Sequence, residues 1–302
     1  MKLDVKIGDI KLANPVMTAS GTFGYAAEYK ELLNFDRIGG IIVKGLSLEP
    51  STGNPLPRVV ETPCGLLNAV GLENVGLKAF IRDKLPFLQT LKSPVFVNIY
   101  GKKVEEYGEL ASAINSLDGI AGVEVNISCP NVSAGGAAFG VDPDAASLVV
   151  DQVRKCTSKH VMVKLSPNVT DIVRIAQAVE DAGADSVSLI NTLTGLAIDS
   201  ETFSPMLANV TGGLSGPAIK PVALRMVWQV ASNVKIPVIG IGGIATATDA
   251  IEFIIAGATA VQVGTAMLVD PDCHGRIVSG LRAFLKRKKF ESINDIRGRL
   301  IV

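Results

Sequence analysis

The stretch VMVKLSPNVTDIVRIAQAVEDAGADSVSLINT, residues 161–192, contains the pattern that decides the fold. Val161–Ser166 is a short apolar run, and a second such run spans Ser186–Thr192. Between them apolar residues recur at helical spacing, with Thr170 as the predicted N-cap and Gly183 as the residue that ends the helix. Because continuous apolar runs are typical of strands buried on both faces, this stretch predicts a strand, a helix and a second, parallel strand.

The same plan recurs along the chain. Thr248–Gly257 repeats the helix, and Gly257-Ala-Thr follows it as Gly183-Ala-Asp follows the first one. The predicted strands number eight: Val16–Ser20, Gly40–Gly45, Pro94–Tyr100, Gly122–Ser128, Val161–Ser166, Ser186–Thr192, Pro237–Gly243 and Ala260–Thr265. Eight strands with helices between them predict an α/β fold, a (β/α)8 TIM barrel forming one domain over residues 1–302. A doubly wound open sheet is the alternative.

Three segments depart from the repeat. Ser51–Leu72 and Thr194–Pro221 are rich in Gly, Pro and Asn, and we expect them to be long loops after the second and sixth strands. Asp4–Lys11 predicts a small hairpin below the barrel. Because barrel enzymes build their sites from the loops that follow strands, the two long loops indicate where a site would lie.

Composition argues against several classes of function. The chain has 29 Lys+Arg and 29 Asp+Glu, whereas nucleic-acid-binding proteins usually carry a basic excess. The four cysteines form no Cys-x-x-Cys pair, so we expect no metal site or iron–sulfur cluster within this chain. The first residues, MKLDVKIGDIKL, lack the apolar segment of a signal peptide, and we expect a cytoplasmic protein without membrane spans.

Polar residues gather where six of the predicted strands end. They include Ser20, Lys44, Gly45, Asn98, Asn126, Cys129, Lys164, Asn191 and Thr192. The carboxyl ends of barrel strands meet at one face, so we expect these residues to share one site. An ammonium inside an apolar strand is costly without an anionic partner, so the two lysines predict bound anions. Lys164 could instead form a Schiff base, whereas the asparagines favour recognition of an imide edge, because each amide offers a donor and an acceptor.

Glycines follow the last two predicted strands. Gly240-Ile-Gly-Gly-Ile-Ala245 comes after the seventh strand, and Gly264-Thr265 closes the eighth. Loops at these positions often bind phosphate through backbone N–H groups and a helix N-terminus, which predicts the phosphate site of a mononucleotide cofactor. A dinucleotide fingerprint is a weaker interpretation, because the string lies late in the chain and lacks the acidic residue at the expected distance.

Cys129 is the predicted catalytic base. It follows the fourth strand in the motif Ser128-Cys-Pro-Asn131. A free thiol has a pKa of about 8.5 and needs only modest lowering to accept a proton near neutral pH. We interpret the other cysteines as small buried residues, and we expect His160 and His274 to lie away from the proposed catalytic face.

Five motifs of the chain resemble the class 1 dihydroorotate dehydrogenases. They are Asn126-Ile-Ser-Cys-Pro-Asn131, Asn68-Ala-Val-Gly-Leu72, Val43-Lys-Gly45, Val163-Lys-Leu-Ser-Pro-Asn168 and Gly240-Ile-Gly-Gly-Ile244, and they cover nearly the whole chain in order. The Ser-Cys-Pro-Asn motif is the specific one, since class 2 enzymes use serine as the base and carry an N-terminal membrane extension. The continuation Asn68–Asn74 resembles class 1B most closely, whose partner chain carries FAD and a [2Fe–2S] cluster and passes electrons to NAD⁺.

The resemblance implies roles for individual residues. Cys129 would remove the C5 proton of dihydroorotate while FMN accepts a hydride from C6, with Lys44 beside them in the catalytic site. Lys164 would offset the charge of reduced flavin. FMN would be held by Ser20, Lys44, Gly45, Asn98, Asn126, Lys164, Ile190, Gly216, Gly242, Gly243, Gly264 and Thr265. Substrate would be held by Lys44, Asn68, Ala69, Val70, Gly71, Leu72, Asn126, Asn191 and Thr192.

The resemblance also implies partners. We expect a homodimer at the core of a heterotetramer, with FAD and [2Fe–2S] on the partner subunit. The Gly/Ala-rich segment Val132–Gly140 is the candidate lid. A class 1A-like homodimer that uses fumarate, a barrel lyase that depends on Lys164, and a tRNA-modifying flavin barrel are the alternatives.

Overall fold

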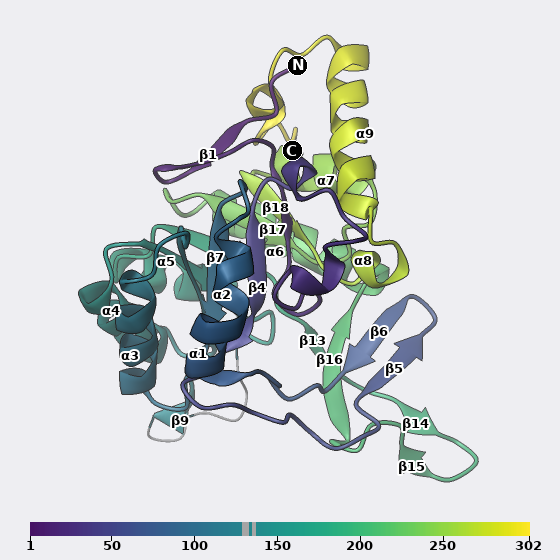
Figure 1. The fold of residues 1–302 in the computed structure, drawn as a ribbon. Helices are drawn as coiled ribbons and strands as arrows, with labels where there is room; N and C mark the ends of the chain where they lie inside the picture. The colour runs from purple at the N-terminus through teal and green to yellow at the C-terminus, as the bar shows by residue number, and fades with distance from the viewer. Residues whose placement is uncertain (129–132, 135–136) are drawn as a thin grey trace.

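The computed structural model describes residues 1–128, 133–134 and 137–302, and its centre is an eight-stranded parallel sheet (Figure 1). The strands follow the order β3-β18-β17-β12-β11-β8-β7-β4. Their bounds are β3 Val16–Thr18, β4 Ile41–Leu46, β7 Val95–Ile99, β8 Gly122–Asn126, β11 His160–Lys164, β12 Ser186–Leu189, β17 Val238–Ile241 and β18 Ala260–Val263. Each overlaps one predicted range, and the predicted (β/α)8 barrel is confirmed.

The first and last strands of this order meet and close the barrel. Met17 of β3 forms a parallel bridge with Gly40, and the N–H of Thr18 donates to the Gly40 carbonyl at 3.1 Å. The Thr18 hydroxyl accepts from the N–H of Ile42 at 2.9 Å and donates to its carbonyl at 3.0 Å. Since Thr18 and Ile42 are both fully buried, one side-chain hydroxyl satisfies two main-chain groups of the seam.

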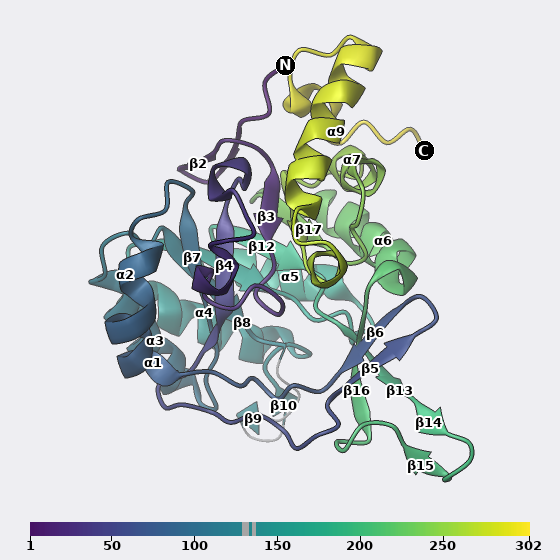
Figure 2. The same ribbon diagram turned by 45° about the vertical axis from the view of Figure 1, so that its right-hand side comes forward.

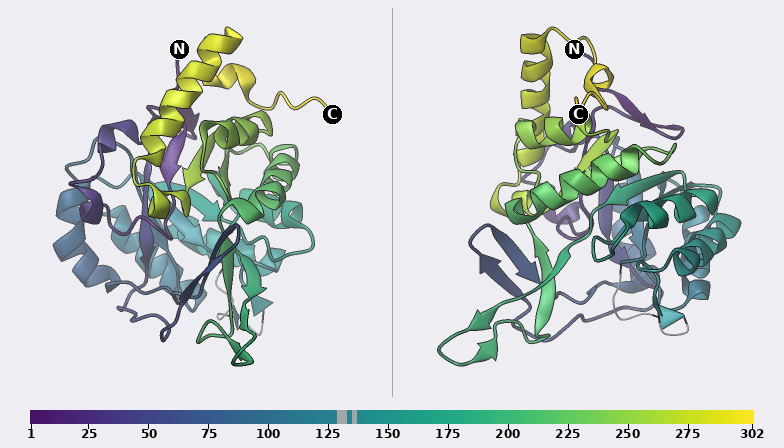
Figure 3. Two further views of the ribbon diagram at one scale, coloured as in Figure 1. Left: turned by 90° about the vertical axis from the view of Figure 1, so that its right-hand side faces the viewer. Right: turned by 180° about the vertical axis from the view of Figure 1, so that it is seen from behind.

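Helices cover the outside of the barrel, as the two further views in Figure 3 show. They are α1 Gly76–Ala79, a π-helical turn Phe80–Lys84, α2 Leu85–Leu88, α3 Val104–Asn115, α4 Pro143–Cys156, α5 Ile172–Asp181, α6 Lys220–Ala231, α7 Ala247–Ile255, α8 Ala266–Val269 and α9 Cys273–Lys288. The expectation of a helix after every strand is wrong at β3, which is followed only by the 3-10 turns Ala27–Tyr29 and Phe35–Arg37. The C-terminal helix α9 packs against β3 instead.

The N-cap of α5 differs by one residue from the prediction. Asp171, and not Thr170, accepts hydrogen bonds from the N–H groups of Val173 and Arg174. A carboxylate at this position also interacts favourably with the helix dipole. Gly183, with a φ of +95°, follows the end of the helix as predicted.

The two segments expected as loops form a second sheet instead. This four-stranded antiparallel sheet has the order β13-β16-β6-β5, with β5 Val59–Thr62, β6 Gly65–Asn68, β13 Leu193–Leu196 and β16 Thr211–Ser215. We call these four strands the cover sheet, because they lie together beside the carboxyl ends of the barrel strands (Figure 2). A further hairpin, β14 Ile198–Asp199 with β15 Ser204–Pro205, extends away from it.

The opposite end of the barrel is closed by the predicted N-terminal hairpin, β1 Val5–Ile7 with β2 Ile10–Leu12. Gly8 of its turn lies so close to His160 that a Cβ there would meet the imidazole at 3.2 Å. The ring of His160 lies 2.8 Å from the Ser186 hydroxyl, and burial lowers its pKa to about 4. Burial in α9 likewise lowers the pKa of His274 to about 4. Both imidazoles are therefore neutral packing groups near neutral pH.

Candidate active site

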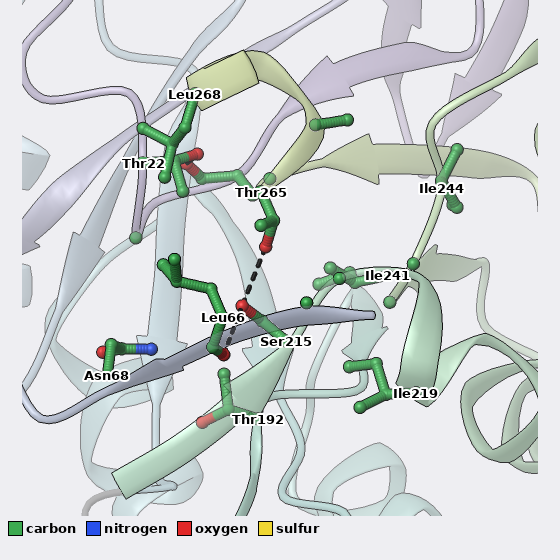
Figure 4. Close-up of a pocket in the computed structure, with 18 of the residues that line it drawn as sticks. Thr22, Leu66, Asn68, Thr192, Ser215, Ile219, Ile241, Ile244, Thr265 and Leu268 are labelled. Atoms are coloured by element: carbon green, nitrogen blue, oxygen red, sulfur yellow. Dashed lines mark hydrogen bonds between the residues drawn. The ribbon is translucent and has the colours of Figure 1, made fainter. Parts of the chain in front are cut away.

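A cavity of about 940 Å³ lies at the carboxyl ends of the barrel strands, between them and the cover sheet (Figure 4). Its volume is at the upper end of the range of roughly 300–1,000 Å³ that small-molecule sites occupy. Seventeen of the predicted site residues line it: Ser20, Lys44, Gly45, Asn68, Val70, Leu72, Asn98, Asn126, Lys164, Ile190, Asn191, Thr192, Gly216, Gly242, Gly243, Gly264 and Thr265. Residues predicted from distant parts of the sequence are thus brought to one place.

Among the described residues, two that were predicted for the site do not line the cavity. Ala69 and Gly71 pack against Asn54 instead: the Asn54 amide donates to the Ala69 carbonyl at 2.9 Å, and a Cβ at Gly71 would meet Asn54 at 2.6 Å. They alternate with Val70 and Leu72, which face the cavity from the same segment. Cys129 lies outside the described residues, so its role remains a prediction.

The glycine loops at one end of the cavity offer unused backbone donors. The N–H groups of Gly242, Gly243, Gly264 and Thr265 donate to no residue in the described part of the chain. Gly242 and Gly243 have φ values of +128° and +70°, which residues with a side chain rarely adopt. This set of donors matches the needs of a phosphate, because phosphate oxygens accept hydrogen bonds without requiring a nearby side-chain cation.

A capping box occupies several N–H groups around the start of α7. The Asp249 carboxylate accepts from Ala245 at 3.0 Å and from Thr246 at 2.8 Å, and the Asp249 N–H donates to the Thr246 hydroxyl at 3.3 Å. These three N–H groups are therefore not available to a phosphate, whereas those of the glycine turns and of Thr265 before α8 are.

One hydrogen bond joins the start of α8 to the cover sheet and a second continues from it within that sheet, and both are visible in Figure 4. The Thr265 hydroxyl donates to the Ser215 hydroxyl at 2.8 Å, and Ser215 donates to the carbonyl of Leu66 at 3.3 Å. Ser215 also lines the cavity and was missed by the sequence analysis, since it lies within the segment interpreted as a loop. The wall formed by the cover sheet is therefore fixed to the barrel beside the glycine loops.

Both predicted lysines project into the cavity, with different partners. The Lys164 ammonium donates to the Ser20 hydroxyl at 3.2 Å and lies 4.0 Å from a carboxylate oxygen of Glu124. The Lys44 side chain forms no hydrogen bond or ion pair with any described residue. Burial lowers the pKa of Lys44 below its ordinary value, an effect that the more distant Glu73 opposes. Lys44 is thus a cation in need of an anion, as the sequence predicted.

Three asparagines leave complementary groups for a ligand. The side-chain carbonyls of Asn126 and Asn191 accept from the N–H groups of Ser128 and Thr192, at 3.2 and 2.8 Å. The amide nitrogen of Asn68 donates to a backbone carbonyl at 3.2 Å. Each amide therefore keeps its other end free of described partners, which leaves two donors and one acceptor at the cavity wall. That set matches a ring bearing both C=O and N–H groups.

Two polar residues at the floor of the cavity were also missed. Gln262 lines the cavity, and Glu124 lies directly beneath it, fully buried. A signal for both was present in the sequence: Glu124 is two residues from Asn126 and Gln262 two residues from Gly264, so each pair shares a face of its strand.

Comparison with known proteins agrees with this geometry. A profile of the family described as "Dihydroorotate dehydrogenase" matches residues 2–285. The chain belongs to the dihydroorotate dehydrogenase family. It is 61% identical over 299 residues to the "Dihydroorotate dehydrogenase B (NAD(+)), catalytic subunit" of Geotalea uraniireducens, covering 99% of this chain and 98% of the relative. The protein of the same name from Geobacter sulfurreducens is 59% identical over 300 residues, with the same two coverages.

The described residues were also searched for metal-binding clusters and for membrane-spanning helices. Within residues 1–128, 133–134 and 137–302, no group of three or more His, Cys, Asp or Glu side chains is arranged to hold a metal ion. Among the same residues, no helix is long and apolar enough to cross a membrane.

Proposed function

We propose that the chain oxidises dihydroorotate to orotate, a step of pyrimidine biosynthesis, in the cytoplasm, and that the electrons pass through FMN and a partner subunit to NAD⁺. The observation that carries this proposal is the lining of the cavity. Part of it offers backbone N–H groups suited to a phosphate, and another part offers asparagine amides and the ammonium of Lys44, which has no partner among the described residues. Dihydroorotate carries a carboxylate on a ring with C=O and N–H groups, and it fits this second set of residues.

FMN, when bound, would supply the acceptor for the hydride that leaves C6 of the substrate. Its phosphate would be held by Gly242, Gly243, Gly264 and Thr265, and its ring would lie towards Lys164. Lys44 would hold the substrate carboxylate and so orient the ring, while Asn126 and Asn191 donate to its oxygens. Cys129 would take the proton from C5, so that one proton and one hydride leave together as the C5–C6 double bond forms.

The electron acceptor is proposed on the names of the relatives, which call them catalytic subunits of NAD⁺-dependent enzymes. We propose a partner subunit that carries FAD and a [2Fe–2S] cluster, bound to a homodimer of this chain. Leu268 and Val269 of α8 lie at the cavity edge with 53% and 87% of their surfaces exposed. An exposed apolar surface beside the cavity is suited to hold such a partner within reach of the flavin.

The test is the visible absorption spectrum of the purified chain, recorded before and after anaerobic addition of dihydroorotate. A flavin band that bleaches supports the cofactor and the reductive half-reaction together. A flavin that does not bleach would overturn the substrate, and a colourless protein that takes up no FMN would favour the lyase alternative. Reoxidation by fumarate in the absence of a partner would favour the class 1A alternative over NAD⁺.

Cys129→Ser tests the base separately. We expect FMN to bind normally and the rate of flavin reduction near neutral pH to fall by roughly 10²–10⁴-fold, because a serine hydroxyl is a far weaker acid than a thiol. Equal rates in the two proteins would remove Cys129 from this role.

A further inference from the structure

The carboxylate of Glu124 connects three residues that form the floor of the cavity. One of its oxygens accepts from the Asn98 amide at 2.6 Å and lies 4.0 Å from the Lys164 ammonium. The other accepts from the Gln262 amide at 2.7 Å and from the Ser188 hydroxyl at 2.9 Å. Asn98, Lys164 and Gln262 line the cavity, whereas Glu124 and Ser188 lie beneath it and are fully buried.

This arrangement fixes the orientation of both amides. An ionised carboxylate only accepts hydrogen bonds, so Asn98 and Gln262 must turn their NH₂ groups towards Glu124. Their carbonyl oxygens are buried and have no partner among the described residues. The free oxygen of Asn98 lies 2.9 Å from where a Cβ of Gly45 would sit, and Gly45 itself lines the cavity. Unpartnered buried acceptors are costly, which indicates that a ligand with N–H or O–H donors completes them.

The Glu124 carboxylate also balances the positive charge of the Lys164 ammonium. Lys164 and Glu124 have only 7% and 0% of their side chains exposed, so their attraction is weakly screened by water. The positive charge that Lys164 presents to the cavity is consequently reduced by the negative charge directly below it. A flavin above this floor would experience the sum of the two charges and not that of the ammonium alone.

We propose that Glu124 is a positioning residue of the flavin site, which orients Asn98 and Gln262 and limits the positive charge of Lys164, and thereby sets the preference of the site between oxidised and reduced FMN. The inference rests on the proposed function, because it takes FMN as the ligand above the floor. Removing the negative charge leaves the ammonium uncompensated, which favours the anionic reduced flavin.

The test compares Glu124→Gln with Ser188→Ala. For each protein, FMN affinity is measured by fluorescence titration and the midpoint potential of bound FMN by anaerobic titration against a redox dye. In Glu124→Gln we expect oxidised FMN to bind at least tenfold more weakly, since the new amide cannot satisfy both neighbouring NH₂ groups. We further expect the ratio of the dissociation constants of oxidised and reduced FMN to increase about tenfold, which for a two-electron couple equals about +30 mV.

Ser188→Ala is the matched control, because it removes one hydrogen bond from the same buried carboxylate and keeps its charge. We expect its FMN potential to equal that of the parent. If Glu124 is only a structural residue, both variants lose thermal stability and neither shifts the potential, and the inference is overturned. Should Glu124→Gln fail to fold, Glu124→Asp keeps the charge but withdraws it by one methylene group. A smaller positive shift is expected there, and no shift overturns the inference.

The outcomes also separate this inference from the proposed function. A parent protein that binds no FMN overturns both. A parent protein whose FMN is bleached by dihydroorotate, with an unchanged potential in Glu124→Gln, leaves the proposed function in place and overturns the role of Glu124 alone.

Discussion

Thr18→Val tests how the barrel is closed. Valine has nearly the same shape as threonine, so packing in the seam is kept while the N–H and carbonyl of Ile42 lose their common partner. A buried backbone group without a hydrogen bond costs about 1–3 kcal/mol, so the two groups together predict a loss of about 2–6 kcal/mol in the free energy of unfolding. Ser20 and Lys44 of the site lie two residues further along the chain from Thr18 and Ile42.

Urea unfolding followed by the fluorescence of Trp228, the single tryptophan, measures this loss. Thr90→Val is the control: the Thr90 hydroxyl also donates to a backbone carbonyl, at 2.7 Å, but this residue is exposed, and water can replace the bond. We expect a change of less than about 0.5 kcal/mol there. If both variants unfold at the same urea concentration as the parent, the Thr18 hydroxyl does not hold the seam and the reasoning is wrong.

Three further predictions follow from the site and from the buried histidines. Gly243→Ala places a Cβ within 2.9 Å of a backbone carbonyl at a φ of +70°, and we expect FMN titration to give at least tenfold weaker binding. The control is Gly298→Ala, which has nearly the same φ of +69° but open space around it, and which should bind FMN as the parent does. Burial lowers the pKa of Lys44, so orotate affinity should decline as the pH rises through that lowered value and the ammonium loses its proton. A Lys44→Met variant should bind orotate weakly at every pH. Spectral titrations with orotate across a range of pH values would test both expectations. The folded-state pKa values of His160 and His274 are about 4, below the ordinary value of 6.5. Between these two values the unfolded chain binds more protons than the folded chain, so the free energy of unfolding should fall as the pH is lowered from 6.5 to 4. Urea unfolding midpoints across this pH range would measure the loss.

The barrel could be predicted from the sequence because its signals are local. Each strand is a short apolar run and most helices carry their own spacing and end signals, as at Gly183. The cover sheet could not, because β6 pairs with β16, where Leu67 lies opposite Leu214, and nothing in either segment indicates a partner so far along the chain. Antiparallel pairing between distant Gly-rich segments depends on the barrel to bring them together.

The site was predictable to the extent that polar residues stood out within apolar strands. Lys44, Lys164 and the asparagines were found in this way. Glu124 was passed over because a single acidic residue in a strand gives no indication of the amides it contacts, which come from other strands. Its role emerges only from the register, in which Asn98 lies beside Glu124 on the neighbouring strand.

The cover sheet has a consequence for how this enzyme family can change. Asn68 and Thr192, proposed to hold substrate alone, lie on the cover sheet or next to it, whereas Lys164 and Gly243, proposed for the cofactor, belong to the barrel and its turns. Lys44 and Asn126, proposed for both ligands, also belong to the barrel. The inserted segments therefore carry a part of the substrate site that can change, by evolution or by protein engineering, while the barrel strands that carry Lys44, Asn126 and Lys164 are inherited unchanged.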